Sequence, residues 1–326
     1  MTAALKLTDL RTVFDAHDGP LPAVDGVSLE IAPGEIHGLV GESGSGKSIT
    51  AFSVMGLLEP PGRIAGGRIE LGGADITGLS GEAMRSLRGR RIAMVFQDPM
   101  MTLNPLMTVG AQMVDAVLAH ERVSRKAALD RAEAVLRRMG IPSPRERLAA
   151  WPGQFSGGMR QRVSIAIALL NGPDIILADE PTTALDVTIQ SQILHEVRDL
   201  ARESGTAFLW ITHDLSVVSG LADSLSVMYM GRIVEQGGTG DILEDPAHPY
   251  TRGLIASLPT ANTRGKPLNQ IPGAAPALAD IPAGCAFAPR CARAGDQCRS
   301  MVPELEAMTA GRVVRCFHPH EKEPLP

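Results

Sequence analysis

The sequence predicts an α/β fold for residues 1–240 and a small irregular domain for residues 241–326. In the first part, short apolar runs rich in β-branched residues alternate with segments of helical periodicity, the pattern of strands connected by helices. In the second part, prolines break up any long helix and predict a linker or an irregular domain. These prolines stand at positions 246, 249, 259, 267, 272, 276 and 282.

The expected core of the first domain consists of buried strands and one helix that follows the first of them. Four apolar runs predict strands: 35–41, 91–97, 174–180 and 207–214. The segment 47–58 predicts the helix. A mostly helical subdomain is expected at about 98–170, and within it "RKAALDRAEAVLRRMG" predicts a helix that ends at Gly140.

Composition excludes several classes of protein. A hydrophobic content of 44%, a charged content of 21% and a net charge of −5 describe a folded chain without general affinity for nucleic acid or anionic lipid. The apolar run "VSIAIALLNGP" is shorter than the ~20 residues that span a bilayer, and predicts a buried helix. The N-terminus lacks the pattern of a signal peptide, so we expect a cytosolic protein whose thiols stay reduced.

The stretch "GESGSGKS" (41–48) matches the phosphate-binding pattern G-x-x-x-x-G-K-[ST] between an expected strand and an expected helix. Lys47 is expected to reach the β- and γ-phosphates of a nucleotide, and Ser48 to ligate Mg²⁺. The flanking strand and helix argue against a chance match. The residues expected to bind the nucleotide here are Gly41, Ser43, Gly44, Ser45, Gly46, Lys47, Ser48 and Ile49.

A pair of acidic residues ends the apolar run "IILADE". Asp179 is suited to holding Mg²⁺, and Glu180 is suited to polarising an attacking water, because a general base must lie within hydrogen-bond reach of it. Alone, such a pair at a strand end indicates a solvated loop. Downstream of a phosphate loop, it indicates the second half of a hydrolytic site.

The segment "FSGGMRQRVSIAIAL" (155–169) resembles the signature motif of ABC ATPases, usually L-S-G-G-Q. Phe155 and Met159 depart from that pattern, whereas Ser156, Gly157 and Gly158 keep it. The resemblance implies a P-loop cassette with a RecA-like core, an antiparallel β subdomain and a helical signature subdomain. It also implies that these five residues face the ATP of a partner cassette.

Other motifs follow in the order that this family shows. Gln97 is similar to the glutamine that contacts metal and attacking water, and Asp186 in "TALD" to the aspartate that reaches across the dimer interface. His213 in "ITHD" resembles the histidine that contacts the γ-phosphate, so the implied catalytic residues are Glu180, His213 and Gln97. Phe14 is the expected adenine-stacking residue, with an ordinary core phenylalanine as the alternative.

Three stretches narrow the resemblance to the ATP-binding subunits of bacterial dipeptide and oligopeptide importers, a group with nickel and glutathione relatives. They are "QDPMMTLNPLMTVGAQ" (97–112), "HPYTRGLIASLP" (248–259) and "GCAFAPRC" (284–291). The resemblance implies an ATPase that powers peptide import from the cytoplasmic face of the cell membrane, to which it is bound peripherally. Import of nickel or glutathione, an exporter ATPase, and a soluble ABC ATPase acting on DNA or ribosomes are the alternatives.

The resemblance also implies partners. One copy of each motif requires a second cassette, either a second copy or, as the family favours, a related ATPase. Two permease subunits and, through them, an extracytoplasmic solute-binding protein complete the expected assembly, which includes no nucleic acid. A run of apolar residues after Gln97 is the candidate permease-docking surface, with ordinary core as the alternative: Met100, Met101, Leu103 and Leu106.

All four cysteines lie near the C-terminus, at positions 285, 291, 298 and 316. Cys285, Cys291, Cys298 and Cys316 lack the C-x₂-C spacing usual in zinc sites. Some relatives with this C-terminal pattern carry a [4Fe–4S] cluster, so the resemblance implies the same structural cofactor here. Zinc and unligated or redox-active thiols remain the alternatives.

Overall fold

The structure, a computed structural model, describes residues 2–183, 185–262, 268–309 and 311–320. Two compact units make up this part of the chain. Unit 1 comprises the residues up to 5, 31–36 and 70–210, and unit 2 comprises 6–30, 37–69 and 211 onward.

Unit 1 contains a set of buried strands in the order β8-β7-β6. Its strands are β5 (Ala74–Asp75), β6 (Ile92–Val95), β7 (Ile175–Asp179) and most of β8 (Ala207–Thr212). Strands β6 and β7 run parallel, with Ile92 opposite Ile175 and Val95 opposite Ala178. Every residue of β6, β7 and β8 is buried. This explains why continuous apolar runs predicted these strands.

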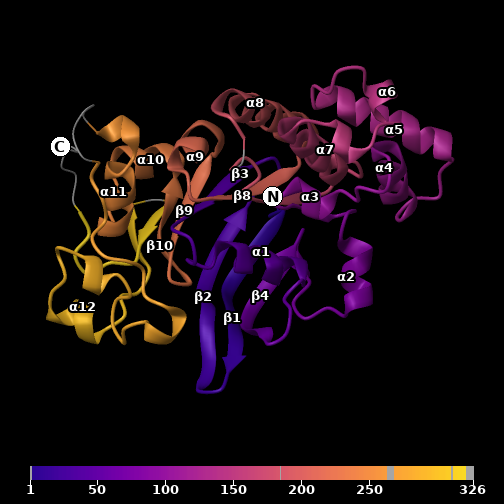
Figure 1. Ribbon diagram of the computed structural model, residues 1–326. Helices are drawn as coiled ribbons and strands as arrows, with labels where there is room; N and C mark the ends of the chain where they lie inside the picture. Colours follow the sequence, from indigo (N-terminus) through magenta and orange to yellow (C-terminus); the bar gives the residue numbers. More distant parts are fainter. Residues whose placement is uncertain (1, 184, 263–267, 310, 321–326) are drawn as a thin grey trace. The chain divides into compact units, whose positions relative to one another are not determined.

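The helices of unit 1 lie mostly between its second and third strands, and α4, α5 and α7 group together in Figure 1. They are α2 (Gly81–Leu87), α3 (Pro99–Thr102), α4 (Val109–Leu118), α5 (Arg125–Arg138), α6 (Pro144–Arg147), α7 (Gly157–Leu169) and α8 (Val187–Ser204). The hydroxyls of Thr108, Ser124 and Ser156 accept the backbone N–H three residues on, which starts α4, α5 and α7. In the described part of the chain, no helix has the length and apolar character needed to cross a membrane.

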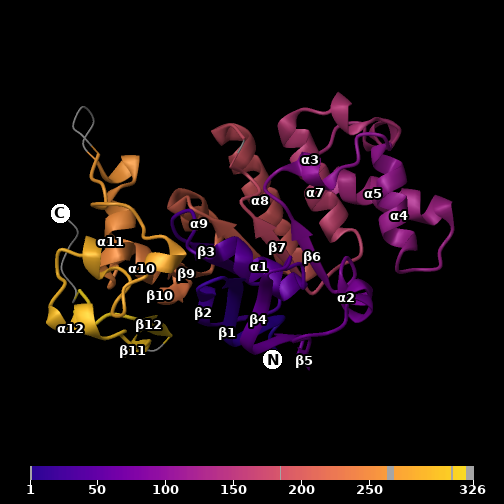
Figure 2. The same ribbon diagram turned by 60° about the horizontal axis from the view of Figure 1, so that its bottom comes forward.

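Unit 2 contains the long hairpin strands and the phosphate loop. Strands β1 (Leu5–Ala16), β2 (Gly19–Ile31) and β4 (Gly62–Leu71) lie side by side in the order β2-β1-β4 (Figures 1 and 2). Strands β3 (Ile36–Val40), β9 (Ser224–Tyr229), β10 (Arg232–Gly238), β11 (Glu306–Thr309) and β12 (Arg312–Val314) follow the order β11-β12-β10-β9-β3. The helices are α1 (Lys47–Met55), α9 (Leu215–Leu221), α10 (Thr239–Glu244), α11 (Pro249–Ala256) and α12 (Asp296–Ser300).

The segment after residue 240 has only short helices, as the prolines predicted, but it also adds two strands that the sequence did not predict, β11 and β12. Strand β12 pairs antiparallel with β10, with Val314 opposite Glu235. Arg312 holds this pairing, because its Nη2 donates to Glu235 Oε1 at 2.7 Å while both side chains are buried. The backbone N–H groups of Ala247 and His248 also donate to the Glu235 carboxylate, at 2.8 and 2.9 Å. A buried charge of this kind is tolerated only with such partners.

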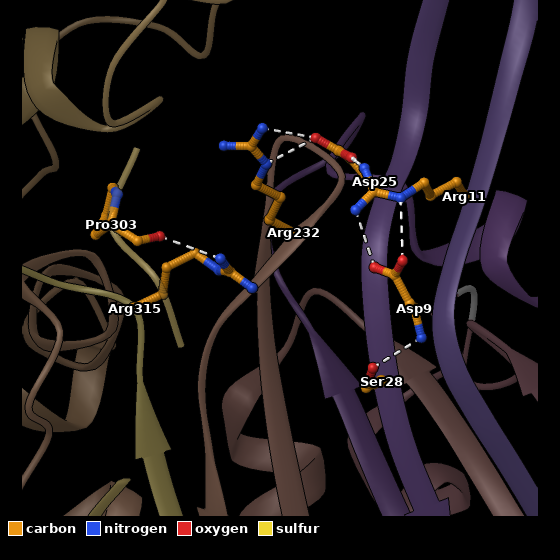
Figure 3. A network of polar contacts seen from close by, with 7 residues as sticks. All are labelled: Asp9, Arg11, Asp25, Ser28, Arg232, Pro303 and Arg315. Carbon is orange, nitrogen blue, oxygen red and sulfur yellow. Dashed lines mark hydrogen bonds and ion pairs between the residues drawn. The ribbon is translucent and has the colours of Figure 1, made fainter. Parts of the chain in front are cut away.

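A chain of ion pairs connects β1, β2 and β10 within unit 2 (Figure 3). Asp25 on β2 accepts from Arg11 Nη1 at 2.5 Å and from Arg232 Nη2 at 2.6 Å. Arg11 also donates to Asp9 on its own strand, at 2.9 Å. Asp25 thus balances two guanidinium groups from different strands and connects the hairpin to β10.

An aromatic cluster forms the core of the C-terminal part of unit 2. The ring centroids of Tyr229 and Tyr250 lie 4.6 Å apart, and that of Phe287 lies 5.3 and 5.4 Å from them. His248 belongs to the same cluster, 5.9 Å from Phe287, and is 1% exposed. Its Nδ1 accepts the Tyr250 backbone N–H at 3.0 Å, which requires an unprotonated nitrogen. Burial lowers the pKa of His248 from 6.5 to about 3.

This depressed pKa predicts that acid weakens the fold through His248. Since the unfolded chain takes up a proton near pH 6.5 and the folded chain only near pH 3, stability falls as pH is lowered through this window. The loss is about 1.4 kcal/mol per pH unit at most. Urea unfolding at pH 7, 6 and 5 should show a shallower pH dependence of the unfolding free energy for His248→Asn than for wild type.

His195→Gln is the control, because His195 is at an exposed position, and it should behave like wild type. Equal slopes for all three proteins would contradict the prediction.

Candidate functional site

The phosphate loop begins where β3 ends. All five residues of β3 are buried, and Gly41 follows with φ of 157°. A Cβ on Gly41 would lie 2.2 Å from the Met228 carbonyl oxygen, a distance that excludes every other residue. The backbone can curl into a loop here only because this position is glycine.

Lys47 occupies the centre of the loop. Its side chain is buried, and its ammonium donates to the carbonyl oxygens of Gly41 at 2.8 Å and Glu42 at 2.9 Å. Ser45 Oγ lies 3.3 Å from the same nitrogen. Ser43 and Gly44 form the exposed tip, and Gly46, Ser48 and Ile49 are half-buried around the first turn of α1. The loop therefore combines a positive charge, a tightly curved backbone that its glycines permit, and a helix N-terminus. Phosphate-binding sites share these three features.

Two residues that motif analysis did not single out contact this loop. The backbone N–H of Glu42 donates to Tyr250 Oη at 2.9 Å. The backbone N–H of Gly231 donates to the Ser45 carbonyl oxygen at 2.9 Å. Neither residue stands in a recognised phosphate motif, although Tyr250 belongs to "HPYTRGLIASLP".

In unit 1, the strand register brings Gln97 and the acidic pair to one edge. Because Val95 lies opposite Ala178 in parallel strands, the residues that follow, Gln97 and Glu180, emerge at the same carboxyl end. Asp179 is the last residue of β7 and is 7% exposed, whereas Gln97 is exposed beyond the end of β6. A glutamine, a buried aspartate and a glutamate therefore gather at one edge of unit 1.

Glu180 has a backbone conformation that is unusual for its residue type. Its φ is 45°, in the left-handed region that non-glycine residues rarely adopt. Thr183 Oγ1 donates to its Oε2 at 3.1 Å and orients the carboxylate. Strained residues of this kind occur preferentially at functional sites.

The signature segment caps α7. Ser156 Oγ accepts the Met159 N–H at 3.3 Å, and Ser156 and Gly157 are exposed at the helix start. A Cβ on Gly158 would lie 2.5 Å from Ile189 Cγ2, so glycine permits α7 to approach α8. Phe155 is buried, and the half-buried Met159 follows the cap within the helix.

The remaining predicted site residues stand at element boundaries or on a strand. Asp186 Oδ1 accepts the Ile189 N–H at 2.9 Å and so caps α8, while its side chain stays exposed. His213 is exposed directly after β8. Phe14 on β1 is half-buried, with its ring against Gly62, where an added Cβ would lie 2.9 Å from Phe14 Cε1.

The candidate docking surface is only partly exposed. Leu106 is 81% exposed and Met100 38% exposed. Leu103 is 1% exposed, so the alternative of an ordinary core residue holds for this position, and Leu103 is not part of a docking surface. The side chain of Met101 lies outside the described residues.

The four cysteines line one cavity of about 310 Å³ of space between atoms, including its open mouth. They form no disulfide. Burial is the main reason that the pKa of the Cys316 thiol is raised to about 11, and the charges of the other three cysteines contribute in the same direction. Within the described residues, no group of three or more His, Cys, Asp or Glu side chains is arranged to hold a metal ion, so the structure by itself shows neither the expected [4Fe–4S] cluster nor a zinc ion.

The G-x-x-x-x-G-K-[ST] loop between the buried strand β3 and helix α1, with Lys47 at its centre, is the feature that defines P-loop nucleotide-binding proteins. Residues 24–183 match the family described as "ABC transporter", and residues 234–298 match "Oligopeptide/dipeptide transporter, C-terminal region". The chain is 45% identical over 318 residues to the oligopeptide transport ATP-binding protein AppD of Bacillus subtilis, covering 97% of each chain. It therefore belongs to the ABC transporter family.

Other comparisons agree with this family. The oligopeptide transport ATP-binding protein OppD of Escherichia coli is 45% identical, with 98% of this chain and 94% of OppD covered. Among solved structures, the dimeric ATP-binding cassette MJ0796, bound to ADP and Pi after hydrolysis, matches with a TM-score of 0.65 at 27% identity. That match covers 72% of this chain and 98% of the cassette.

Proposed function

We propose that this chain is the ATP-hydrolysing subunit of a peptide importer and works with a separate membrane permease. The observation that carries the proposal is the phosphate loop, with buried Lys47 at its centre. Peptides are favoured over nickel or glutathione because AppD and OppD are named oligopeptide transport proteins and match along nearly the whole chain. The same matches favour a transporter over an ATPase acting on DNA or ribosomes.

In this proposal, the loop residues bind the phosphates of ATP through backbone N–H groups, and Lys47 neutralises the β- and γ-phosphates. Ser48, Gln97 and Asp179 would hold Mg²⁺, and their hydroxyl, amide and carboxylate oxygens are the ligand types that this ion prefers. Bound Mg²⁺ would neutralise the charge that develops on the phosphates.

Hydrolysis requires a group that accepts a proton from water. Glu180 is assigned this role because its carboxylate follows the buried Asp179 and is oriented by Thr183. His213 would donate to the γ-phosphate, and Gln97 would orient the attacking water. Phe14 would stack on adenine.

The signature segment would complete the site of a second cassette, since this chain has one copy of each motif. Ser156 and Gly157 are exposed, and their N–H groups would bind the γ-phosphate held by the partner, while Asp186 would reach across the interface. We propose a related ATPase as that partner. ATP would close the pair because it binds the closed state more tightly, and hydrolysis would reopen it.

The permease would dock on the exposed apolar residues that follow Gln97. Met100 and Leu106 remain candidates for this surface, without Leu103. Two permease subunits would connect the ATPases to an extracytoplasmic solute-binding protein. The chain would then be bound peripherally at the cytoplasmic face of a bacterial cell membrane.

Glu180→Gln should still bind ATP and lose most of its turnover, by about 10²- to 10⁴-fold, because a positioned base is removed. Steady-state phosphate release and equilibrium ATP binding by the purified variant measure the two effects. Glu203→Gln, an exposed change in the same unit, should hydrolyse ATP as wild type does. Near-normal phosphate release by Glu180→Gln would remove Glu180 from this role.

A tagged chain purified from solubilised membranes of its own cells should carry two permease subunits and a second ATPase. Leu106→Glu should reduce the recovered permease, because it places a charge on the docking surface, without changing ATP hydrolysis. Leu79→Glu changes another exposed leucine of unit 1 and should leave the recovery of the permease unchanged. Recovery of ribosomes or DNA in place of a permease would support the soluble ABC ATPase.

We further propose that the four cysteines hold a [4Fe–4S] cluster with a structural role. Their common cavity supports this, since Cys285, Cys291, Cys298 and Cys316 all line it. Burial raises the pKa values of Cys285, Cys291 and Cys316, so these thiols are protonated at neutral pH, and binding of a metal would release their protons. A four-iron cluster is wider than one ion, so its ligands stand further apart than a single metal site requires.

Protein purified without oxygen should be brown and contain about four iron and four sulfide per chain, the composition of this cluster. Cys298→Ser should lower both contents and the temperature of unfolding. Ser300→Ala, an exposed change in the same short helix, should leave the iron content, the sulfide content and the temperature of unfolding unchanged. Colourless, iron-free wild-type protein, or one zinc per chain, would contradict the proposal.

A further inference from the structure

An ion pair joins the phosphate loop to the cysteine-bearing segment, 248 residues further along the chain. Arg290, between Cys285 and Cys291, donates from Nη1 and Nη2 to the two carboxylate oxygens of Glu42 at 2.6 and 2.9 Å. The Arg290 side chain is 5% exposed and that of Glu42 is 31% exposed. Such a two-pronged geometry fixes both the position and the orientation of the carboxylate.

The surroundings of Arg290 hold it rigidly in place. Its Nε donates to the Pro272 carbonyl oxygen at 2.9 Å, and its Nη1 also lies 3.3 Å from Tyr229 Oη. Its guanidinium carbon lies 5.8 Å from the ring centroids of both Tyr229 and Phe287. The same aromatic cluster contributes Tyr250 Oη, which accepts the Glu42 backbone N–H. Glu42 is thus held at its carboxylate and at its backbone by the C-terminal half of unit 2.

The negative charge of Glu42 lies in the phosphate loop, and Arg290 neutralises it. Glu42 is the second residue of a loop built to receive a polyphosphate, so an uncompensated carboxylate there repels the ligand. Arg290 compensates this charge from the side of the C-terminal segment. Lys47 cannot serve both purposes, because its ammonium is held by the loop carbonyl oxygens and is needed by the phosphates.

We propose that Arg290 is a positioning residue for ATP, which sets the affinity of the phosphate loop by holding and neutralising Glu42. The proposal rests on the proposed binding of ATP at this loop. The segment between Cys285 and Cys291 therefore influences the affinity of the phosphate loop for ATP. Arg290 ends the short helix Ala288–Arg290 directly before Cys291, so the conformation of the cysteine segment determines where the guanidinium lies.

Titration of the purified chain with a fluorescent ATP analogue and Mg²⁺ tests the proposal. Arg290→Gln should raise the Kd at least about fivefold, the lower end of coupling between linked sites. Its kcat at saturating ATP should change little, because Arg290 does not touch the reacting atoms. Arg290→Lys should give an intermediate Kd, since lysine keeps the positive charge but cannot make the two parallel hydrogen bonds of the guanidinium. Arg299→Gln, an exposed change on α12, is the matched control and should bind as wild type does.

The double variant Glu42→Gln/Arg290→Gln separates charge compensation from a general loss of structure. With no carboxylate to neutralise, it should bind the analogue within about twofold of wild type, a strong departure from additivity. A double variant that binds as weakly as Arg290→Gln overturns the proposal. An Arg290→Gln variant that binds as wild type does also overturns it. Absence of binding by wild type itself contradicts the ATP site and not the role of Arg290.

Discussion

The structure of unit 2 depends on how closely the backbone packs around the phosphate loop. There is no space for a Cβ at Gly41, because the Met228 carbonyl oxygen would lie 2.2 Å from it. The Ser45 carbonyl oxygen accepts from Gly231 N, and the Gly231 carbonyl oxygen accepts from Asp25 N. The turn between β9 and β10 is therefore fixed to the loop, and strand β2 to that turn, by main-chain hydrogen bonds. A shift in any of them must move the loop, since packed interiors do not deform gradually.

Charge compensation extends this constraint to the C-terminal segment. Glu235 is fully buried and is paired with Arg312, which holds β12. Glu42 and Arg290 repeat the arrangement at the loop itself. Because an unpaired buried charge costs several kcal/mol, each pair requires both of its distant segments to be in place. The C-terminal segment is thus an integral part of unit 2 as well as the location of the cysteines.

Most of the core strands could be predicted because they are buried on both faces. The run at 175–179 is wholly apolar up to Asp179, and such runs are recognisable without any knowledge of their neighbours. Strand β12 has only three residues and exists because β10 offers it a pairing edge, so no local pattern indicates it. For Leu103 the sequence left a docking surface and the core as alternatives for a similar reason, because only packing decides whether an apolar residue after a strand faces solvent. The Arg290–Glu42 pair has no sequence signal beyond a charged residue in an otherwise apolar turn.

The length of chain between Glu42 and Arg290 has a consequence for biosynthesis. The two residues are 248 positions apart, so the ribosome adds Arg290 roughly 12 to 50 s after Glu42 at about 5–20 residues per second. During that interval the loop sequence is complete but its carboxylate has no guanidinium partner. The phosphate loop, among the first motifs to be translated, is therefore among the last parts of the protein to reach its final electrostatic state.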